Sequence, residues 1–105
     1  MTRRRRTKLQ RRLMHAVMFG DLRHVSNALR AGADANQPSA GLGSDGLPLC
    51  AAACWGQTDT VRELLAAGAD PDAREDDGAG STASEWAARG GWSATLAVLR
   101  AAGAR

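Results

Sequence analysis

Tyrosine is absent from this chain of 105 residues, and the only aromatic residues are three tryptophans and one phenylalanine. With large side chains so scarce, alanine must fill much of the core, which suits helices that lie close together. Long apolar runs are also missing, because no stretch approaches the 18 or more residues that a membrane-spanning helix requires. Hydrophobic residues make up 44% of the chain and charged residues 24%, as in ordinary soluble globular proteins.

Cysteine is nearly absent, with only Cys50 and Cys54 in the chain. They stand four residues apart within an expected helix, so a disulfide between them would close a trivial loop, and a reducing compartment fits best. The arginines near the amino terminus resemble the start of a signal peptide. The segment that follows them is broken by His15 and Asp21, however, and provides no apolar region of the kind that such a signal needs. We therefore expect a cytoplasmic protein without a membrane span.

Acidic residues are absent from residues 3–12, RRRRTKLQRR, which hold seven of the 14 basic residues. The remaining chain has seven basic and 11 acidic residues, a net charge of −4. The formal net charge of +3 therefore hides a basic arm, residues 1–8, in front of an acidic domain, residues 9–105.

Within that domain one pattern occurs three times. The copies are GDLRHVSNALRAGADAN (20–36), GQTDTVRELLAAGADPD (56–72) and GWSATLAVLRAAGA (91–104). In each copy a second glycine follows the first after 12 residues, and the repeat steps are 36 and 35 residues. A period of this length indicates a stacked array in which no unit buries its apolar face alone. We expect repeats at about 9–40, 41–76 and 77–105.

Each repeat predicts two short helices separated by a glycine that can adopt a left-handed cap. In the second helices apolar residues recur at i, i+3, i+4 spacing, as in Val61, Leu64 and Leu65, and predict one buried face. The segments 36–46 and 72–81 are rich in Gly, Asp, Ser and Asn and predict projecting turns, called fingers below. The expected class is all-α, with helices at 7–18, 22–30, 48–54, 58–66, 82–89 and 93–101.

The segment GLPLCAAACWGQTDTVRELLAAGADPD (46–72) resembles the ankyrin repeat, and the resemblance extends over about residues 9–105. Residues Leu47–Cys50 stand at the T-P-L-H motif of that family, the third unit keeps only Thr82 of it, and the first unit keeps little. Degenerate outer units are typical of capping repeats. The resemblance implies an ankyrin-type solenoid of three stacked helix-turn-helix repeats with projecting fingers.

Three motifs suggest small-molecule or metal sites, and each has a plainer interpretation. The glycines of residues 41–46 match G-x-G-x-x-G, but no apolar strand precedes them, so a long finger is favoured. The acidic turn from Asp70 has Arg74 and Ser81 at positions where calcium needs oxygen ligands, and it is better explained as a solvated turn. Cys50 and Cys54 share a helical face but lack further zinc ligands nearby in sequence. We expect no cofactor.

Catalytic groupings are missing as well, because no Ser/His/Asp set falls on matched turns. We therefore expect a non-catalytic, monomeric module that binds a partner protein. The resemblance implies that the residues just before the first glycine of each unit line a concave groove beside the fingers, with Phe19 and Trp55 as neighbours. Acidic fingers favour a basic or mixed-charge epitope. The expected partner-binding residues are Met18, Phe19, Asp45, Cys54, Trp55, Arg74, Glu75, Asp76, Asp77 and Arg89.

Two other tryptophans have different expected positions. Trp86 falls in the middle of a helix and is expected to face the core, whereas Trp92 follows a glycine and is expected to lie on the next turn. The alternative function is nucleic-acid binding by the basic arm, which would be weak and without sequence preference. A solvated tail explains the same charge run, as does an arm that lies on its own acidic domain. The expected phosphate contacts are Arg3, Arg4, Arg5, Arg6 and Lys8.

Overall fold

The computed structural model describes residues 3–37, 47–75 and 80–104, with side-chain detail from Lys8 onward. Its described residues form helices and turns, with a single isolated bridge between Arg74 and Thr82. The all-α class is therefore confirmed. The helices are α1 (Arg3–Met18), α2 (Leu22–Arg30), α3 (Pro48–Cys54), α4 (Thr58–Ala66), α5 (Ala83–Gly90) and α6 (Ser93–Ala101).

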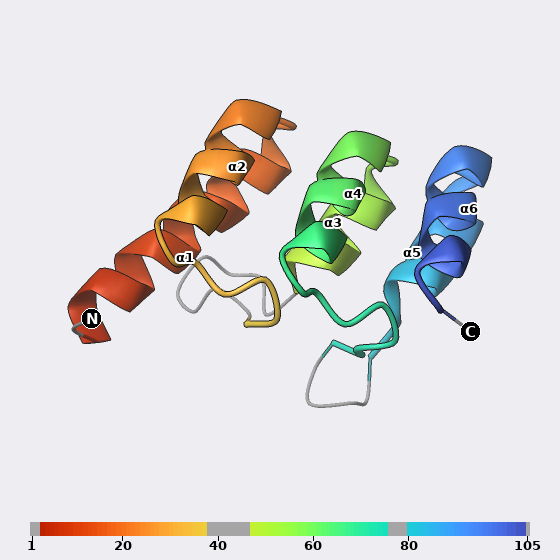
Figure 1. Cartoon of the computed structure of the whole chain (residues 1–105). Coiled ribbons are helices and arrows are strands. Elements are labelled where there is room, and N and C mark those ends of the chain that lie inside the picture. The colour runs from red at the N-terminus through yellow and green to blue at the C-terminus, as the bar shows by residue number, and fades with distance from the viewer. Residues whose placement is uncertain (1–2, 38–46, 76–79, 105) are drawn as a thin grey trace.

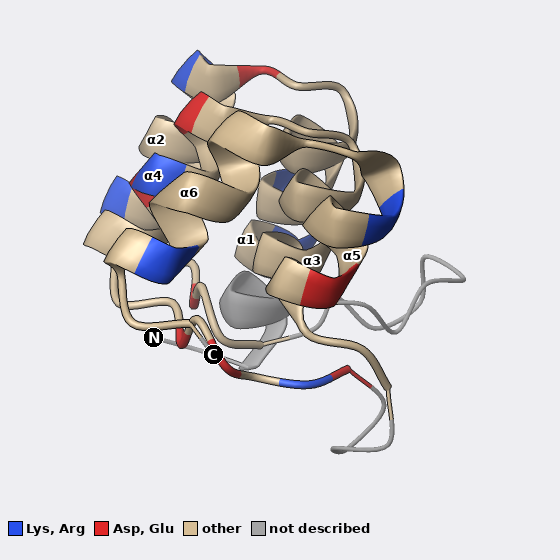
Figure 2. Cartoon of the chain, turned by 90° about the vertical axis from the view of Figure 1, so that its right-hand side faces the viewer, with Lys and Arg blue, Asp and Glu red and all other residues tan. Residues whose placement is uncertain are grey.

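The helices form three pairs that stand in a row (Figure 1). Seen along the row, α1, α3 and α5 make one layer and α2, α4 and α6 the other (Figure 2). The middle pair contacts both outer pairs, since α3 lies against α1 and α5 while α4 lies against α2 and α6. The turns within pairs gather at one end of the stack, and the loops that leave α2 and α4 lie at the opposite end (Figure 1).

The turns within pairs depend on left-handed glycines. Gly20, Gly56 and Gly91 have φ angles of 67°, 66° and 73°, a conformation that side chains with a Cβ adopt at a cost. Each glycine follows the first helix of its pair closely, as the glycine spacing predicts. The repeated glycines therefore fix the position of the chain reversal in all three repeats.

The core runs through all three pairs along the predicted apolar faces. Val61 and Leu64 of α4 are fully buried, as are Val25 of α2 and Leu99 of α6. The buried Thr95 is satisfied by a hydrogen bond of 2.9 Å between its hydroxyl and that of Thr58. Because these residues come from neighbouring pairs, no repeat buries its apolar face without the next.

Four helices have the predicted bounds, and the other two differ. Helix α5 begins one residue later than expected, because the Thr82 side chain caps it by accepting from the Glu85 backbone N–H. The predicted start of the first helix at residue 7 is wrong, since α1 begins at Arg3. Arginine is a good helix former, so residues 3–8 of the expected arm continue the helix.

Candidate functional site

Large apolar side chains are exposed where the turns within pairs gather. Phe19, after α1, is 81% exposed, and Trp55, after α3, is 64% exposed. Met18 and Trp92 are also exposed at this end. We call these four residues the turn-end row.

Side-chain hydrogen bonds hold the neighbouring turns together. The Gln57 side-chain amide donates to the Val17 carbonyl at 2.6 Å, and the Trp92 indole N–H donates to the Cys54 carbonyl at 3.1 Å. Trp92 therefore lies on the turn of the preceding repeat rather than on the next one. Phe19 and Trp55 consequently follow helices whose ends are neighbours, as the repeat spacing predicts.

The expected position of these aromatics beside the fingers is wrong. The turns within pairs and the loops that lead to the fingers lie at opposite ends of the stack (Figure 1). The reason is the position of the helix in the chain, because each finger precedes a first helix and each exposed aromatic follows one. Even the seven residues of α3 separate the two ends by about 10 Å at 1.5 Å per residue.

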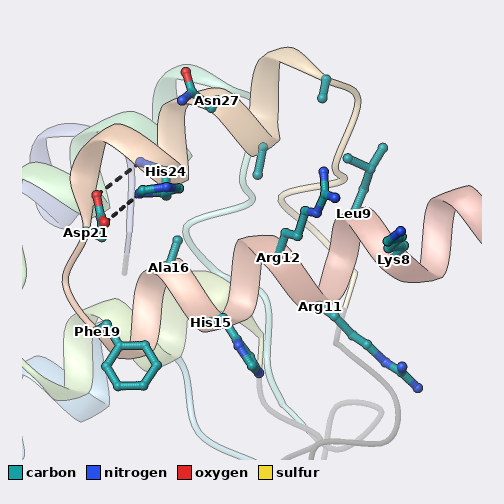
Figure 3. A pocket seen from close by; sticks show the side chains of 12 residues that line it. Lys8, Leu9, Arg11, Arg12, His15, Ala16, Phe19, Asp21, His24 and Asn27 are labelled. Atoms are coloured by element: carbon teal, nitrogen blue, oxygen red, sulfur yellow. Dashed lines mark hydrogen bonds and ion pairs between the residues drawn. The ribbon is translucent and has the colours of Figure 1, made fainter.

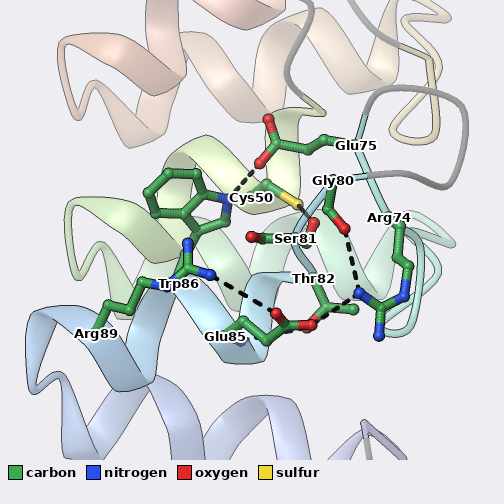
Figure 4. Close-up of polar contacts among 9 residues, drawn as sticks. All are labelled: Cys50, Arg74, Glu75, Gly80, Ser81, Thr82, Glu85, Trp86 and Arg89. Carbon is green, nitrogen blue, oxygen red and sulfur yellow. Dashed lines mark hydrogen bonds and ion pairs between the residues drawn. The ribbon is translucent and has the colours of Figure 1, made fainter.

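The described finger residues make contacts within the protein (Figure 4). Arg74 forms an ion pair with Glu85 at 2.9 Å and also donates to the Gly80 carbonyl at 3.1 Å. The carboxylate of Glu75 accepts a hydrogen bond from the Trp86 indole. Arg74 and Glu75, two of the expected partner-binding residues, are thus held by contacts with Glu85 and Trp86 of α5. The other expected finger residues, Asp45, Asp76 and Asp77, lie outside the described residues.

Trp86 is partly buried and packs against the core, as predicted, although its side chain is not fully enclosed. Glu75 provides an acceptor for its indole N–H, which buried tryptophans require. Arg89, another expected partner-binding residue, has its guanidinium 5.1 Å from the Trp86 ring centroid and 3.8 Å from a Glu85 oxygen. Its charge is therefore shared with groups of its own repeat.

The two cysteines differ in their surroundings. Cys50 is buried, and its thiol lies 3.7 Å from the Ser81 carbonyl. Burial, together with the nearby Glu75 carboxylate, raises the pKa of Cys50 to about 12, so the reactive thiolate is scarce at neutral pH. Cys54 is half-buried. In the described parts of the chain, no three His, Cys, Asp or Glu side chains come close enough to hold a metal ion.

An open groove of about 880 Å³ lies between α1 and α2 (Figure 3). It is not predicted from the sequence, although Lys8, Arg11 and Arg12 place three cations along a short stretch of one helix, with Lys8 and Arg12 at i, i+4 spacing. Its lining is mostly basic and apolar. The residues that line it are Lys8, Leu9, Arg11, Arg12, His15, Ala16, Phe19, Asp21, His24, Asn27, Ala28 and Ala31.

Three stacked helix pairs with left-handed glycine turns define a helical solenoid. A family model for ankyrin repeats matches residues 13–105 with three copies. The chain therefore belongs to the ankyrin-repeat family, whose repeats are generally protein–protein interaction modules and typically non-catalytic. A search of the curated proteins finds no significant match. None of the helices in the described ranges is both long and apolar enough to cross a membrane.

Proposed function

We propose that this chain is a binding module whose turn-end row contacts a partner protein. The observation that carries the proposal is the exposure of Phe19 and Trp55, at 81% and 64%, after the ends of neighbouring helices. Tryptophan, phenylalanine and methionine are enriched in protein interfaces, and tryptophan is prominent among the residues that contribute most binding energy. These side chains therefore provide an anchor that a partner can bury.

The arrangement of the row supports a continuous contact rather than isolated exposed residues. The Gln57 hydrogen bond to Val17 joins the first turn to the second, and the Trp92 hydrogen bond to Cys54 joins the second to the third. The turns are therefore held in register before a partner arrives. A rigid surface loses less conformational entropy on binding than a flexible one.

The described finger residues are less available to a partner than the sequence predicts. Arg74 and Glu75 are engaged with Glu85 and Trp86, and a partner would have to compete with those contacts. A preference for a basic or mixed-charge epitope accordingly depends on Asp45, Asp76 and Asp77. We base the proposal on the apolar row and leave the charge of the epitope as a prediction.

Replacing Trp55 tests the role of the row. Trp55→Ala should weaken binding by about 2 kcal/mol, roughly thirty-fold in Kd. The experiment captures partners on the immobilised full chain, identifies them, and then measures each purified partner by calorimetry against the wild type and the variant. The thermal unfolding of the variant is measured alongside.

Trp55→Phe is the matched control, because it keeps an aromatic anchor and should recover most of the affinity. The exposed side chain contributes little to folding, so both variants should melt within a few degrees of the wild type. Equal affinities of the wild type and Trp55→Ala for every captured partner would contradict the proposal. Unfolding of Trp55→Ala would show instead that Trp55 belongs to the core.

The expected alternative, nucleic-acid binding by the basic arm, stays a prediction. The backbone of residues 3–8 is helical, but the side chains of Arg3, Arg4, Arg5 and Arg6 lie outside the described detail. No feature of the turn-end row favours a nucleic acid over a protein partner.

A further inference from the structure

We propose that the groove between α1 and α2 binds an acidic helix of a partner protein. The groove is lined by residues of the first pair only, and its lining side chains lie in front of the remaining helices in Figure 3. It is separate from Trp55, although Phe19 lies at its edge and belongs also to the turn-end row.

The cations that line the groove have no acidic partners among the described residues. Lys8, Arg11 and Arg12 are exposed, and none of them belongs to an ion pair formed within the described ranges. By contrast, Arg74 of the second repeat and Arg89 of the third both contact Glu85. The first repeat therefore presents positive charge that its own described side chains leave uncompensated.

The one acidic residue of the lining does not neutralise these cations. Asp21 accepts a hydrogen bond from the His24 backbone N–H and contacts the His24 ring. That backbone hydrogen bond is the main cause that lowers the pKa of Asp21. Its carboxylate is thus used at the start of α2, at the Phe19 end of the groove.

The shape of the groove suits a helix. Lys8 on α1 and Phe19 directly after α1 are eleven positions apart, which is about 16 Å or three helical turns at 1.5 Å per residue. Small side chains also line the groove, namely Ala16 on α1, Ala28 on α2 and Ala31 directly after α2. Small residues permit close approach of an apolar stripe, and cations at the rim complement carboxylates that flank such a stripe.

Three hydrogen bonds of one side chain prepare the groove for binding. The Gln10 side chain donates to the carbonyls of Asp34 and Gln37 and accepts from the Asp34 backbone N–H. These bonds attach α1 to the loop that follows α2. The helix walls therefore keep their spacing without a ligand, and less ordering is left for the binding step.

The same features favour a peptide helix over a nucleic acid. A phosphate backbone gains from the cations but gains little from the apolar side chains of the lining. An acidic amphipathic helix uses both. On its other side α1 already lies against a helix, α3, as α2 lies against α4, so helix-to-helix contact is the ordinary way in which this pair buries its faces.

The test uses the full chain and a fluorescein-labelled, capped helical peptide of about 15 residues, with an alanine–leucine stripe flanked by glutamates. Anisotropy should detect binding that weakens with salt. The double variant Arg11→Gln/Arg12→Gln should weaken it by roughly ten-fold or more, because charge-assisted contacts are lost. The matched control is Arg62→Gln/Arg100→Gln, which removes the same charge from exposed helix positions outside the groove and should change affinity less than about three-fold.

Two further variants test whether the peptide binds in the groove and not at the turn-end row. Asn27→Trp places a bulky side chain at an exposed position that lines the groove, and it should block the peptide without a change of charge. Trp55→Ala should leave the peptide affinity unchanged, which separates this proposal from the turn-end row. Binding that falls equally in both arginine double variants, or that persists in Asn27→Trp, would overturn the proposal.

Two control ligands separate the possible occupants. The same peptide with glutamine in place of every glutamate should bind at least ten-fold more weakly if carboxylates are recognised. Equal binding of that peptide would overturn the proposal. An oligothymidylate of equal charge that binds as tightly as the acidic peptide would also overturn it, and would identify the groove as a nucleic-acid site.

Discussion

The two interfaces between repeats are joined by the same sequence position but by different chemistry. The residue after the turn glycine is Gln57 in the second repeat and Trp92 in the third, and each donates to a carbonyl of the preceding repeat. A Cβ on Gly20 would lie 3.7 Å from the Gln57 side chain, whereas a Cβ on Gly56 would lie 2.3 Å from the Trp92 ring. The Gln57 amide thus leaves room for a Cβ at Gly20, whereas the Trp92 indole fills the space beside Gly56.

In the first repeat the residue after the turn glycine makes a third kind of contact. Asp21 accepts from the His24 backbone N–H and so caps its own helix α2. Gln57 and Trp92 stand at the same place before α4 and α6, but neither side chain caps its helix. The residue at this position therefore either caps the helix that follows it or forms a hydrogen bond to the repeat that precedes it. The difference teaches that this stack couples its repeats at the cost of helix capping.

The largest expected effect comes from a residue that both interfaces share. Leu64 is fully buried on α4, which lies between α2 and α6. Leu64→Ala should lower the free energy of unfolding by about 2–5 kcal/mol, and the loss should disturb both interfaces together. Urea unfolding followed by circular dichroism measures it.

Leu22→Ala is the matched control, because Leu22 is 37% exposed and should lose less than about 1 kcal/mol. If the free energy of unfolding of Leu64→Ala lies within about 1 kcal/mol of the wild-type value, the assignment of α4 to the centre of the core is wrong.

The next prediction compares the two glycines directly. Gly20 and Gly56 have φ angles of 67° and 66°, so alanine should suffer similar backbone strain at both, about 1–2 kcal/mol. Gly56→Ala must also displace the Trp92 ring, and we expect it to cost roughly 1–3 kcal/mol more. Differential thermal unfolding of the two variants measures the gap. Equal destabilisation would mean that the indole moves away from the turn freely.

The smallest effect concerns the cap at Asp21. Its pKa is lowered in the folded state, so its stabilising effect is complete above the ordinary value of 3.8 and is lost as pH falls through the lowered folded value. Asp21→Asn keeps a capping side chain without the charge. The variant should melt slightly below the wild type at pH 6, and the two should converge under strongly acidic conditions. A constant difference across that range would exclude the charge as the cause.

The sequence predicts the stack well because glycine spacing and apolar periodicity are local signals. Gly20 and Val61, for example, have the predicted backbone and burial. For Trp86 the sequence predicts that the side chain faces the core but not its hydrogen-bond acceptor, because Glu75 comes from another segment. The predicted position of Trp55 beside the fingers was wrong for a similar reason. The end of the stack at which Trp55 lies depends on the direction in which α3 runs. The groove depends on how α2 lies along α1, and the charge run alone does not contain that information.

The three tryptophans stand in the second and third repeats, and the first repeat has none. Intrinsic fluorescence at the red edge of tryptophan excitation therefore reports on the second and third repeats and not on the first. Trp55, at 64% exposed, should emit like a solvated indole, whereas the indoles of Trp86 and Trp92 are hydrogen-bonded to Glu75 and to the Cys54 carbonyl. Opening of α1 alone would be nearly silent in emission but visible in far-ultraviolet ellipticity, because α1 is the longest described helix. A mismatch between the two optical signals would reveal that the repeats do not unfold together.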